Sequence, residues 1–193
     1  MKTPLFAIAL TTLLHLAPVQ AATPPLRDRG PAPELAGVKT WFNSQPLSLR
    51  QLRGKVVLVD FWTYSCINCI RTLPHVARLY ETYKDQGLVV IGVHTPEYPF
   101  ERSTDNVRSA TKRFGLTYPV VQDNDYATWN AFRNQYWPAA YLIDQDGRIV
   151  HTQIGEGGYA EMDAAVRALL QRRSSQMTSE TTTDMTRQVT MGK

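Results

Sequence analysis

The feature that most constrains this chain is an apolar run, KVVLVDFW, at residues 55–62. A strand covered on both faces has such a continuous apolar sequence, because neither face meets water. A second run of this kind, LVVIGVH, occupies residues 88–94. Between the runs, apolar side chains recur at helical spacing at positions 70, 73, 76, 77 and 80, and Gly87 is placed to end that helix. The sequence therefore predicts two buried strands joined by a helix.

The rest of the chain continues this alternation. Short strands are predicted at residues 38–42, 47–49 and 118–121, and the turn QDG is expected to join two further strands at residues 139–144 and 148–154. Helices are predicted at residues 101–114, 125–132 and 161–170. This order indicates an α/β fold in which helices flank a central mixed β-sheet that carries an N-terminal β extension.

The two ends of the chain differ in composition from this middle part. Residues 1–21 combine a short positive start, an apolar stretch and small residues at a cleavage site, which predicts a signal peptide, with an uncleaved anchor as the alternative. Residues 22–36 are rich in Pro and Arg and predict a linker, whereas the Ser- and Thr-rich residues 172–193 predict a disordered tail. One domain is expected at residues 37–171. A signal peptide implies export to the periplasm or another extracytoplasmic space, where disulfides persist.

The charge of the chain argues against one class of partner. Its net charge is +4, and the basic residues are scattered rather than gathered with aromatic side chains. A nucleic-acid-binding protein concentrates such residues on one face. We therefore expect no nucleic-acid partner.

The only two cysteines, Cys66 and Cys69, stand where the first apolar run gives way to the helix. Backbone N–H groups in the first turn of a helix are unpaired and carry the positive end of its dipole. A thiolate at Cys66 is stabilised there, and Cys69, one turn later and more buried, is the natural resolving thiol. This placement predicts dithiol–disulfide exchange, which needs no cofactor because the sulfurs carry both electrons.

Four other interpretations of the pair remain open. A structural disulfide closing so short a loop would contribute only about 2 kcal/mol. A metal site needs four Cys or His ligands, and the candidates His75, His94 and His151 have no metal spacing with the cysteines, so we expect no metal. A thiol-dependent peroxidase is suggested by Thr63, three residues before Cys66, although no proline starts that loop. A thioredoxin-like binding module with a permanently closed disulfide is the fourth.

Four segments together resemble the thioredoxin superfamily. They are GKVVLVDFWTYSCINCIRTLPHV, VIGVHTPEY, YWPAAYLID and GEGGY, and they occur in the order of that superfamily. The combination is most similar to the TlpA/ResA/DipZ branch of extracytoplasmic thiol–disulfide oxidoreductases, over about residues 37–170. The sequence departs from most thioredoxins at Ser65, where they have Trp, and at Ile67-Asn68, where they have Gly-Pro.

The resemblance implies roles for two carboxylates. Asp60 matches the buried carboxylate of thioredoxins, which acts as a base for Cys69, and burial without a partner should raise its pKa. A capping or salt-bridged Asp60 is the alternative. Glu97 matches an acidic position near the dithiol, and a solvated loop carboxylate is the alternative there.

The resemblance also implies a substrate surface. The Trp137–Pro138 peptide bond is expected to be cis and to lie beside the dithiol, where backbone groups bind a substrate chain. Trp137 is expected to form part of an apolar rim, or else to pack in the core. Trp62 is expected beside the motif as a further substrate-binding residue.

For function, the resemblance implies a reductase acting on protein disulfides, with apocytochrome c or a repair enzyme as the substrate and hence a role in cytochrome c biogenesis or disulfide repair. It also implies a CcdA- or DsbD-like membrane protein as the electron donor. Ile67 and Asn68 place no basic residue between the cysteines. A strong oxidant, whose reduced form is unusually stable, is therefore less expected.

Overall fold

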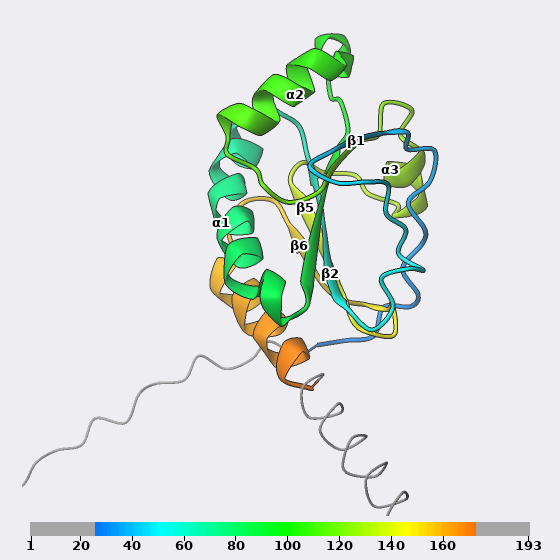
Figure 1. Cartoon of the computed structure of the whole chain (residues 1–193), viewed down its shortest axis with the longest axis vertical. Helices are drawn as coiled ribbons and strands as arrows, with labels where there is room; N and C mark the ends of the chain where they lie inside the picture. The colour runs from blue at the N-terminus through cyan, green and yellow to red at the C-terminus, as the bar shows by residue number, and fades with distance from the viewer. Residues whose placement is uncertain (1–25, 173–193) are drawn as a thin grey trace, which may run out of the picture.

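The computed structural model describes residues 26–172, and Figure 1 shows them as one sheet with helices on both sides. The predicted signal peptide at residues 1–21, the first residues of the predicted linker and the predicted tail beyond residue 172 lie outside the described residues. Within residues 26–172, no helix combines the length and the apolar character that crossing a membrane requires.

The sheet has six strands in the order β1-β4-β3-β2-β5-β6. Their bounds are β1 Thr40–Phe42, β2 Val56–Trp62, β3 Leu88–His94, β4 Val120–Gln122, β5 Ala139–Ile143 and β6 Ile149–Ile154. β2, β3 and β4 run parallel to one another, while β1, β5 and β6 are antiparallel to the strands they pair with. The sheet is therefore mixed, which confirms the predicted fold class.

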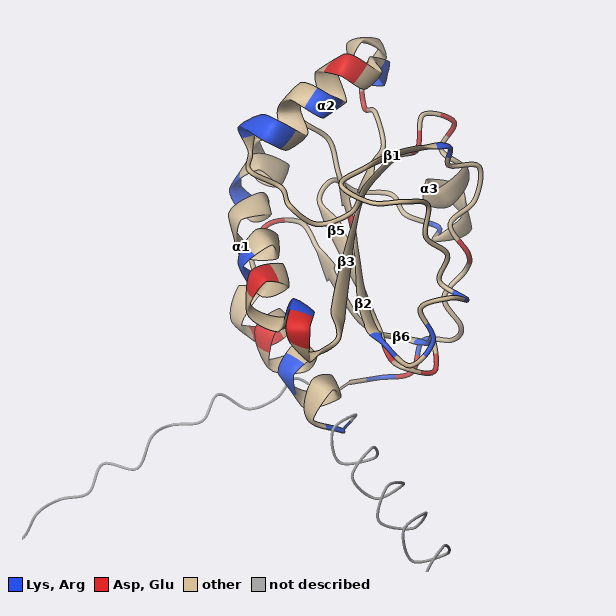
Figure 2. Cartoon of the chain, in the orientation of Figure 1, with Lys and Arg blue, Asp and Glu red and all other residues tan. Residues whose placement is uncertain are grey.

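Helices cover both faces of this sheet. They are α1 Ile67–Tyr83, α2 Thr104–Arg113 and α3 Ala127–Ala131, the short 3-10 helices η1 Lys84–Gln86 and η2 Pro99–Arg102, and a last helix at residues 159–172. Figure 1 shows α1, α2 and the orange last helix on one face, and α3 with the N-terminal segment on the other. Both signs of charge occur on α1 and on α2 (Figure 2).

β2 lies inside the sheet, and every one of its residues is buried. Leu58 and Trp62 face the core beneath α1, whereas Val59 and Phe61 face the opposite core. Burial on both faces explains why the sequence of this strand is apolar without interruption. Asp60 lies between Leu58 and Trp62, so the two-residue alternation of a strand points its carboxylate toward the α1 side.

α1 places the dithiol at the edge of the core. Cys66 is its N-cap, and its buried side chains include Cys69, Leu73 and Val76, three or four residues apart along one helical face. The chain continues through η1 to Gly87, whose φ of 106° is a left-handed conformation that glycine adopts without strain. The predicted helix and its end at Gly87 are therefore confirmed.

Part of the predicted linker is packed on the domain. Backbone N–H groups of Arg27 and Arg29 donate to the carbonyl oxygens of Val150 and Ile149, over 3.0 and 2.8 Å. Pro31 forms an isolated bridge with Arg148. Residues 27–32 therefore run along the edge of the sheet beside β6, and the folded unit begins before residue 37.

The strand predicted at residues 47–49 does not form. The Glu34 carboxylate accepts the backbone N–H groups of Leu49 and Arg50, over 2.6 and 3.1 Å. Turns follow from Leu49 onward. The Glu34 side chain thus accepts backbone N–H groups that a neighbouring strand was expected to bind. The N-terminal β extension consists of β1 and the segment beside β6.

Candidate active site

Cys66 and Cys69 occupy different environments at the first turn of α1. Cys66 is partly exposed, and its sulfur accepts the backbone N–H of Cys69 over 3.4 Å. The Cys69 side chain is fully buried. The sulfur that a substrate can reach therefore sits at the positive end of the helix, with the second sulfur behind it.

Cys69 cannot ionise easily by itself. Burial raises the pKa of the Cys69 thiol, and contact with Cys66 raises it further, while a hydrogen bond from the Thr63 backbone opposes part of this effect. The negative charge of Asp60 also acts on Cys69 in the same upward direction. A thiol in this environment stays protonated at neutral pH, so using it as a nucleophile requires a base nearby.

Asp60 is a buried carboxyl whose charge acts on Cys69. Its side chain is 1% exposed, its Oδ1 has no hydrogen-bond partner, and burial raises its pKa to about 8. None of the ion pairs found within residues 26–172 involves Asp60. A buried carboxyl with a pKa near neutrality suits proton exchange with a thiol at physiological pH.

The Trp137–Pro138 bond is cis and lies beside the dithiol. The Trp137 carbonyl oxygen is 4.0 Å from the Cys66 sulfur. The Trp137 indole donates to the Thr95 carbonyl over 3.0 Å, and its ring lies 4.1 Å from that of Trp129. Core packing thus fixes the indole, while the backbone of Trp137 faces the reactive sulfur.

Glu97 has the exposure of a solvated loop carboxylate, which was the alternative for this residue. Its side chain is exposed, whereas Glu101, four residues later, is fully buried. Glu101 accepts the Ser65 hydroxyl over 2.5 Å and the backbone N–H groups of Glu97 and Tyr98. The acidic residue that contacts the dithiol loop is therefore Glu101, through the residue that precedes Cys66.

Glu101 keeps its charge despite its burial. Burial alone would raise its pKa, but hydrogen bonds from the side chains of Ser65 and Thr63 and from two backbone N–H groups bring the pKa below its usual value. The sequence predicted that Glu101 begins a helix over residues 101–114, whereas Glu101 lies in η2, before α2. One signal was available: Ser65 leaves a hydroxyl beside the dithiol that needs an acceptor.

The Thr63 hydroxyl is hydrogen-bonded to two buried side chains, those of His94 and Glu101. Its oxygen lies 3.3 Å from His94 Nε2. Burial lowers the pKa of His94 to about 4, so this imidazole is neutral. It packs 5.5 Å from the Tyr64 ring. The hydroxyl that would serve a peroxidase at Cys66 is thus occupied elsewhere.

Trp62 does not line the substrate surface as expected. It is fully buried in the core beneath α1, because its position in β2 points it inward. Four large apolar side chains are exposed on segments joined to the dithiol loop or to the Trp137–Pro138 bond, and we call them the apolar rim: Ile67, Tyr98, Phe100 and Tyr136. Ile67 follows Cys66, Tyr136 precedes Trp137, and the Phe100 carbonyl accepts the Tyr64 hydroxyl. Sequence reasoning missed this rim, because nothing local distinguishes an exposed aromatic residue from a buried one.

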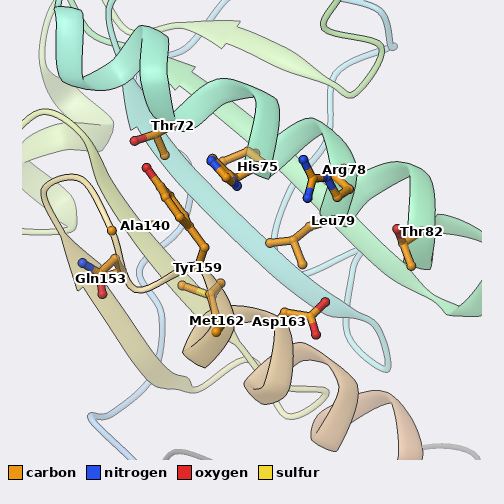
Figure 3. A pocket seen from close by; sticks show the side chains of 13 residues that line it. Thr72, His75, Arg78, Leu79, Thr82, Ala140, Gln153, Tyr159, Met162 and Asp163 are labelled. Carbon is orange, nitrogen blue, oxygen red and sulfur yellow. The ribbon is translucent and has the colours of Figure 1, made fainter. Parts of the chain in front are cut away.

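The GEGGY motif lines a separate cavity. This cavity, about 370 Å³, lies between α1 and the last helix (Figure 3). His75 and Tyr159 stack across it with ring centroids 3.6 Å apart. Neither cysteine lines it. Among residues 26–172, no group of three or more His, Cys, Asp or Glu side chains is arranged to hold a metal ion.

The chain is similar to known redox proteins over most of the described residues. The Redoxin family model matches residues 28–169. Protein DipZ of Mycobacterium tuberculosis is 50% identical over 169 residues, which cover 83% of this chain but only 24% of DipZ. The thiol-disulfide oxidoreductase YkuV of Bacillus subtilis is 32% identical over 142 residues, 74% of this chain and 95% of YkuV. A solution structure of a thioredoxin-like protein in the oxidised form matches with a TM-score of 0.67 and 33% identity, covering 76% of this chain and 97% of that one.

Proposed function

The chain belongs to the Redoxin family and has a thioredoxin-like fold, and from this premise we propose that it is a thiol–disulfide oxidoreductase that reduces protein disulfides through Cys66 and Cys69. One observation carries the proposal. The partly exposed Cys66 caps α1 and lies against the buried Cys69. This arrangement provides one sulfur for attack and a second for release.

In the first step, the Cys66 thiolate attacks one sulfur of a substrate disulfide. The substrate S–S bond breaks as the bond to Cys66 forms, and the departing sulfur takes a proton from water. First-turn N–H groups, including that of Cys69 at 3.4 Å, stabilise the attacking thiolate.

In the second step, Asp60 removes the proton from Cys69. The resulting thiolate attacks Cys66, so the bond between Cys66 and the substrate breaks as the Cys66–Cys69 disulfide forms. The second substrate sulfur leaves as a thiolate and is protonated. Two electrons have then passed from the protein to the substrate, and the proton lost by Cys69 resides on Asp60.

The substrate chain binds beside the cis Trp137–Pro138 bond. The backbone carbonyl of Trp137 faces Cys66, and the apolar rim offers exposed side chains on the adjoining segments. Exposed apolar side chains near a reactive group mark an interaction surface. An extended polypeptide with apolar residues next to its cystine fits this surface.

Direction, partners and location complete the proposal. We extend the proposal to the reduction of apocytochrome c or of a repair enzyme outside the cytoplasm, with electrons from a CcdA- or DsbD-like membrane protein, because the four sequence segments resemble the TlpA/ResA/DipZ branch. The absence of a basic residue between the cysteines also favours a reductant. A Cys69→Ser variant is expected to trap client and donor as mixed disulfides in a periplasmic extract. A Cys66→Ser variant is the matched control and should trap nothing.

A redox titration against dithiothreitol tests this function against a binding module. We expect the Cys66–Cys69 pair to open and close reversibly at a potential more reducing than that of strong oxidants, about −120 mV. A disulfide that resists excess dithiothreitol would support the binding module instead. Rapid consumption of hydrogen peroxide by the reduced protein, far above that of free cysteine, would support the peroxidase.

A further inference from the structure

Three buried polar atoms beneath the dithiol have no hydrogen-bond partner. They are Asp60 Oδ1, Trp62 Nε1 and the Tyr118 hydroxyl. Each of these side chains is at most 1% exposed. Because buried polar groups are nearly always hydrogen-bonded, each such exception in a native protein calls for an explanation. Three exceptions in one region indicate a shared role.

Gly92 brings these three side chains together. It pairs with Asp60 across β2 and β3. A Cβ atom at Gly92 would lie 3.0 Å from Tyr118 Cε2 and 3.1 Å from Trp62 Nε1. Both rings therefore reach over the backbone directly beside Asp60. On the other side, Asp60 pairs with Ala140, so small residues flank the carboxylate on both neighbouring strands.

Two titratable groups, Cys69 and Tyr118, interact with the charge of Asp60. Cys69 faces it from α1 and Tyr118 from the segment before β4. Burial raises the pKa of each of these two groups, and the charge of Asp60 raises it further. The paired residues on β3 and β5, Gly92 and Ala140, cannot titrate. The Tyr118 hydroxyl is thus the titratable donor that faces Asp60 in addition to the thiol itself.

The chemistry of these groups favours one protonation state of Asp60. An ionised carboxylate only accepts hydrogen bonds, whereas an indole N–H only donates and a phenol can donate. Donors beside Asp60 therefore stabilise the carboxylate more than the carboxylic acid. Such donors increase the fraction of Asp60 that is ready to take a proton.

We propose that the Tyr118 hydroxyl, which like Asp60 Oδ1 has no hydrogen-bond partner in this structure, is a positioning group that turns to donate a hydrogen bond to Asp60 once the carboxylate is ionised and before it takes the proton from Cys69. This inference rests on the proposed function and adds a residue to its second step. The S–H bond of Cys69 breaks and an O–H bond forms on Asp60, while the phenol keeps its own proton. The thiolate left on Cys69 then attacks Cys66 as described above.

A Tyr118→Phe variant tests this role, because it removes only the hydroxyl. The reduced protein is mixed with an aromatic disulfide that releases one coloured thiolate when Cys66 attacks and a second when Cys69 resolves the adduct. We expect the pH midpoint of the second release to rise by about one unit, since a charge-assisted hydrogen bond has been lost. At pH 7 the second release should be about tenfold slower, while the first release keeps its rate.

Tyr141→Phe is the matched control. Tyr141 is a buried tyrosine whose hydroxyl bonds to Asn134 in the opposite core, away from Asp60. This variant should leave the midpoint unchanged. A ¹³C NMR titration of the Asp60 carboxyl in the reduced Tyr118→Phe protein should show the same upward shift.

The outcomes separate the two proposals. If wild type gives two releases but Tyr118→Phe has the wild-type midpoint, the role of Tyr118 is wrong and the proposed function stands. If wild type gives no second release, the resolving step fails, and the role of Tyr118 fails with it.

Discussion

Asp60 is the residue at which stability and activity conflict. Burial raises its folded-state pKa to about 8, far above about 3.9 in an unfolded chain. The native state therefore holds this proton more tightly than the unfolded state between those values. Stability should accordingly fall as pH rises from about 4 to about 8.

An Asp60→Asn variant should remove this dependence. At pH 7 we expect it to be more stable than wild type by about 2 kcal/mol or more, because folding of the variant no longer requires a carboxylate to take up a proton. Its Cys69-dependent release step should slow at the same time. Urea unfolding at pH 5 and pH 8 measures the first effect. A wild-type stability that is equal at both pH values would contradict the assigned environment of Asp60.

Glu101 should set the redox balance of the pair. Glu101→Gln removes a buried negative charge that contacts the residue before Cys66 and replaces one of its two accepting oxygens by an NH2 donor. We expect a loss of about 2 kcal/mol in stability and a reduction potential that becomes less negative by about 15–30 mV, since 30 mV corresponds to about 1.4 kcal/mol. Equilibration with glutathione buffers measures the potential.

Glu97→Gln is the control for this measurement. Glu97 carries the same carboxylate in the same loop but is exposed. The stability and the reduction potential of Glu97→Gln should therefore stay close to those of wild type. A changed reduction potential in Glu97→Gln and an unchanged one in Glu101→Gln would support Glu97, the residue predicted from the sequence, as the carboxylate that acts on the dithiol.

These residues also show what a sequence can predict at this scale. The contrast between Cys66 and Cys69 depends on one strand and the helix that follows it, so local spacing was sufficient to predict it. Glu101 meets Ser65 across 36 positions in the sequence. Only the folded chain brings them together, and the same holds for Tyr118 and Asp60.

At the scale of the element, the residue that caps the N-terminus of α1 is also the proposed attacking cysteine, Cys66. The Cys66 sulfur accepts the Cys69 N–H, which a hydroxyl at that position could equally accept. We expect Cys66→Ser to be more stable than Cys66→Ala by about 1 kcal/mol, as measured by urea unfolding of both variants. Equal stabilities would show that the cap contributes nothing to the helix.

The strands differ in how far sequence alone determined them. β2 and β3 were predictable, because burial on both faces leaves a continuous apolar signature. Residues 47–49 alternate like a strand but have no strand beside them, since Glu34 takes up their backbone donors. Strand formation depends on a partner, and hydrophobic pattern alone does not reveal where partners lie.

At the scale of the whole molecule, the sheet connects the dithiol with the groups that control it. β2 supplies Asp60 and leads into the cysteine loop, β3 supplies Gly92 and leads into the Glu101 loop, and β5 begins after the cis proline. Parallel β2 and β3 bring the two loops to one edge of the sheet. Residues 27–32 pair along the free edge of β6, although their composition predicted a linker.

The most direct test follows the reaction of reduced protein with a peptide that contains one disulfide. Mass spectrometry at successive times identifies which cysteine carries the peptide and when the protein disulfide closes. We predict a transient adduct on Cys66 alone, which decays to a Cys66–Cys69 disulfide and a fully reduced peptide. An adduct on Cys69, or a peptide that stays oxidised beside the reduced protein, would contradict the account.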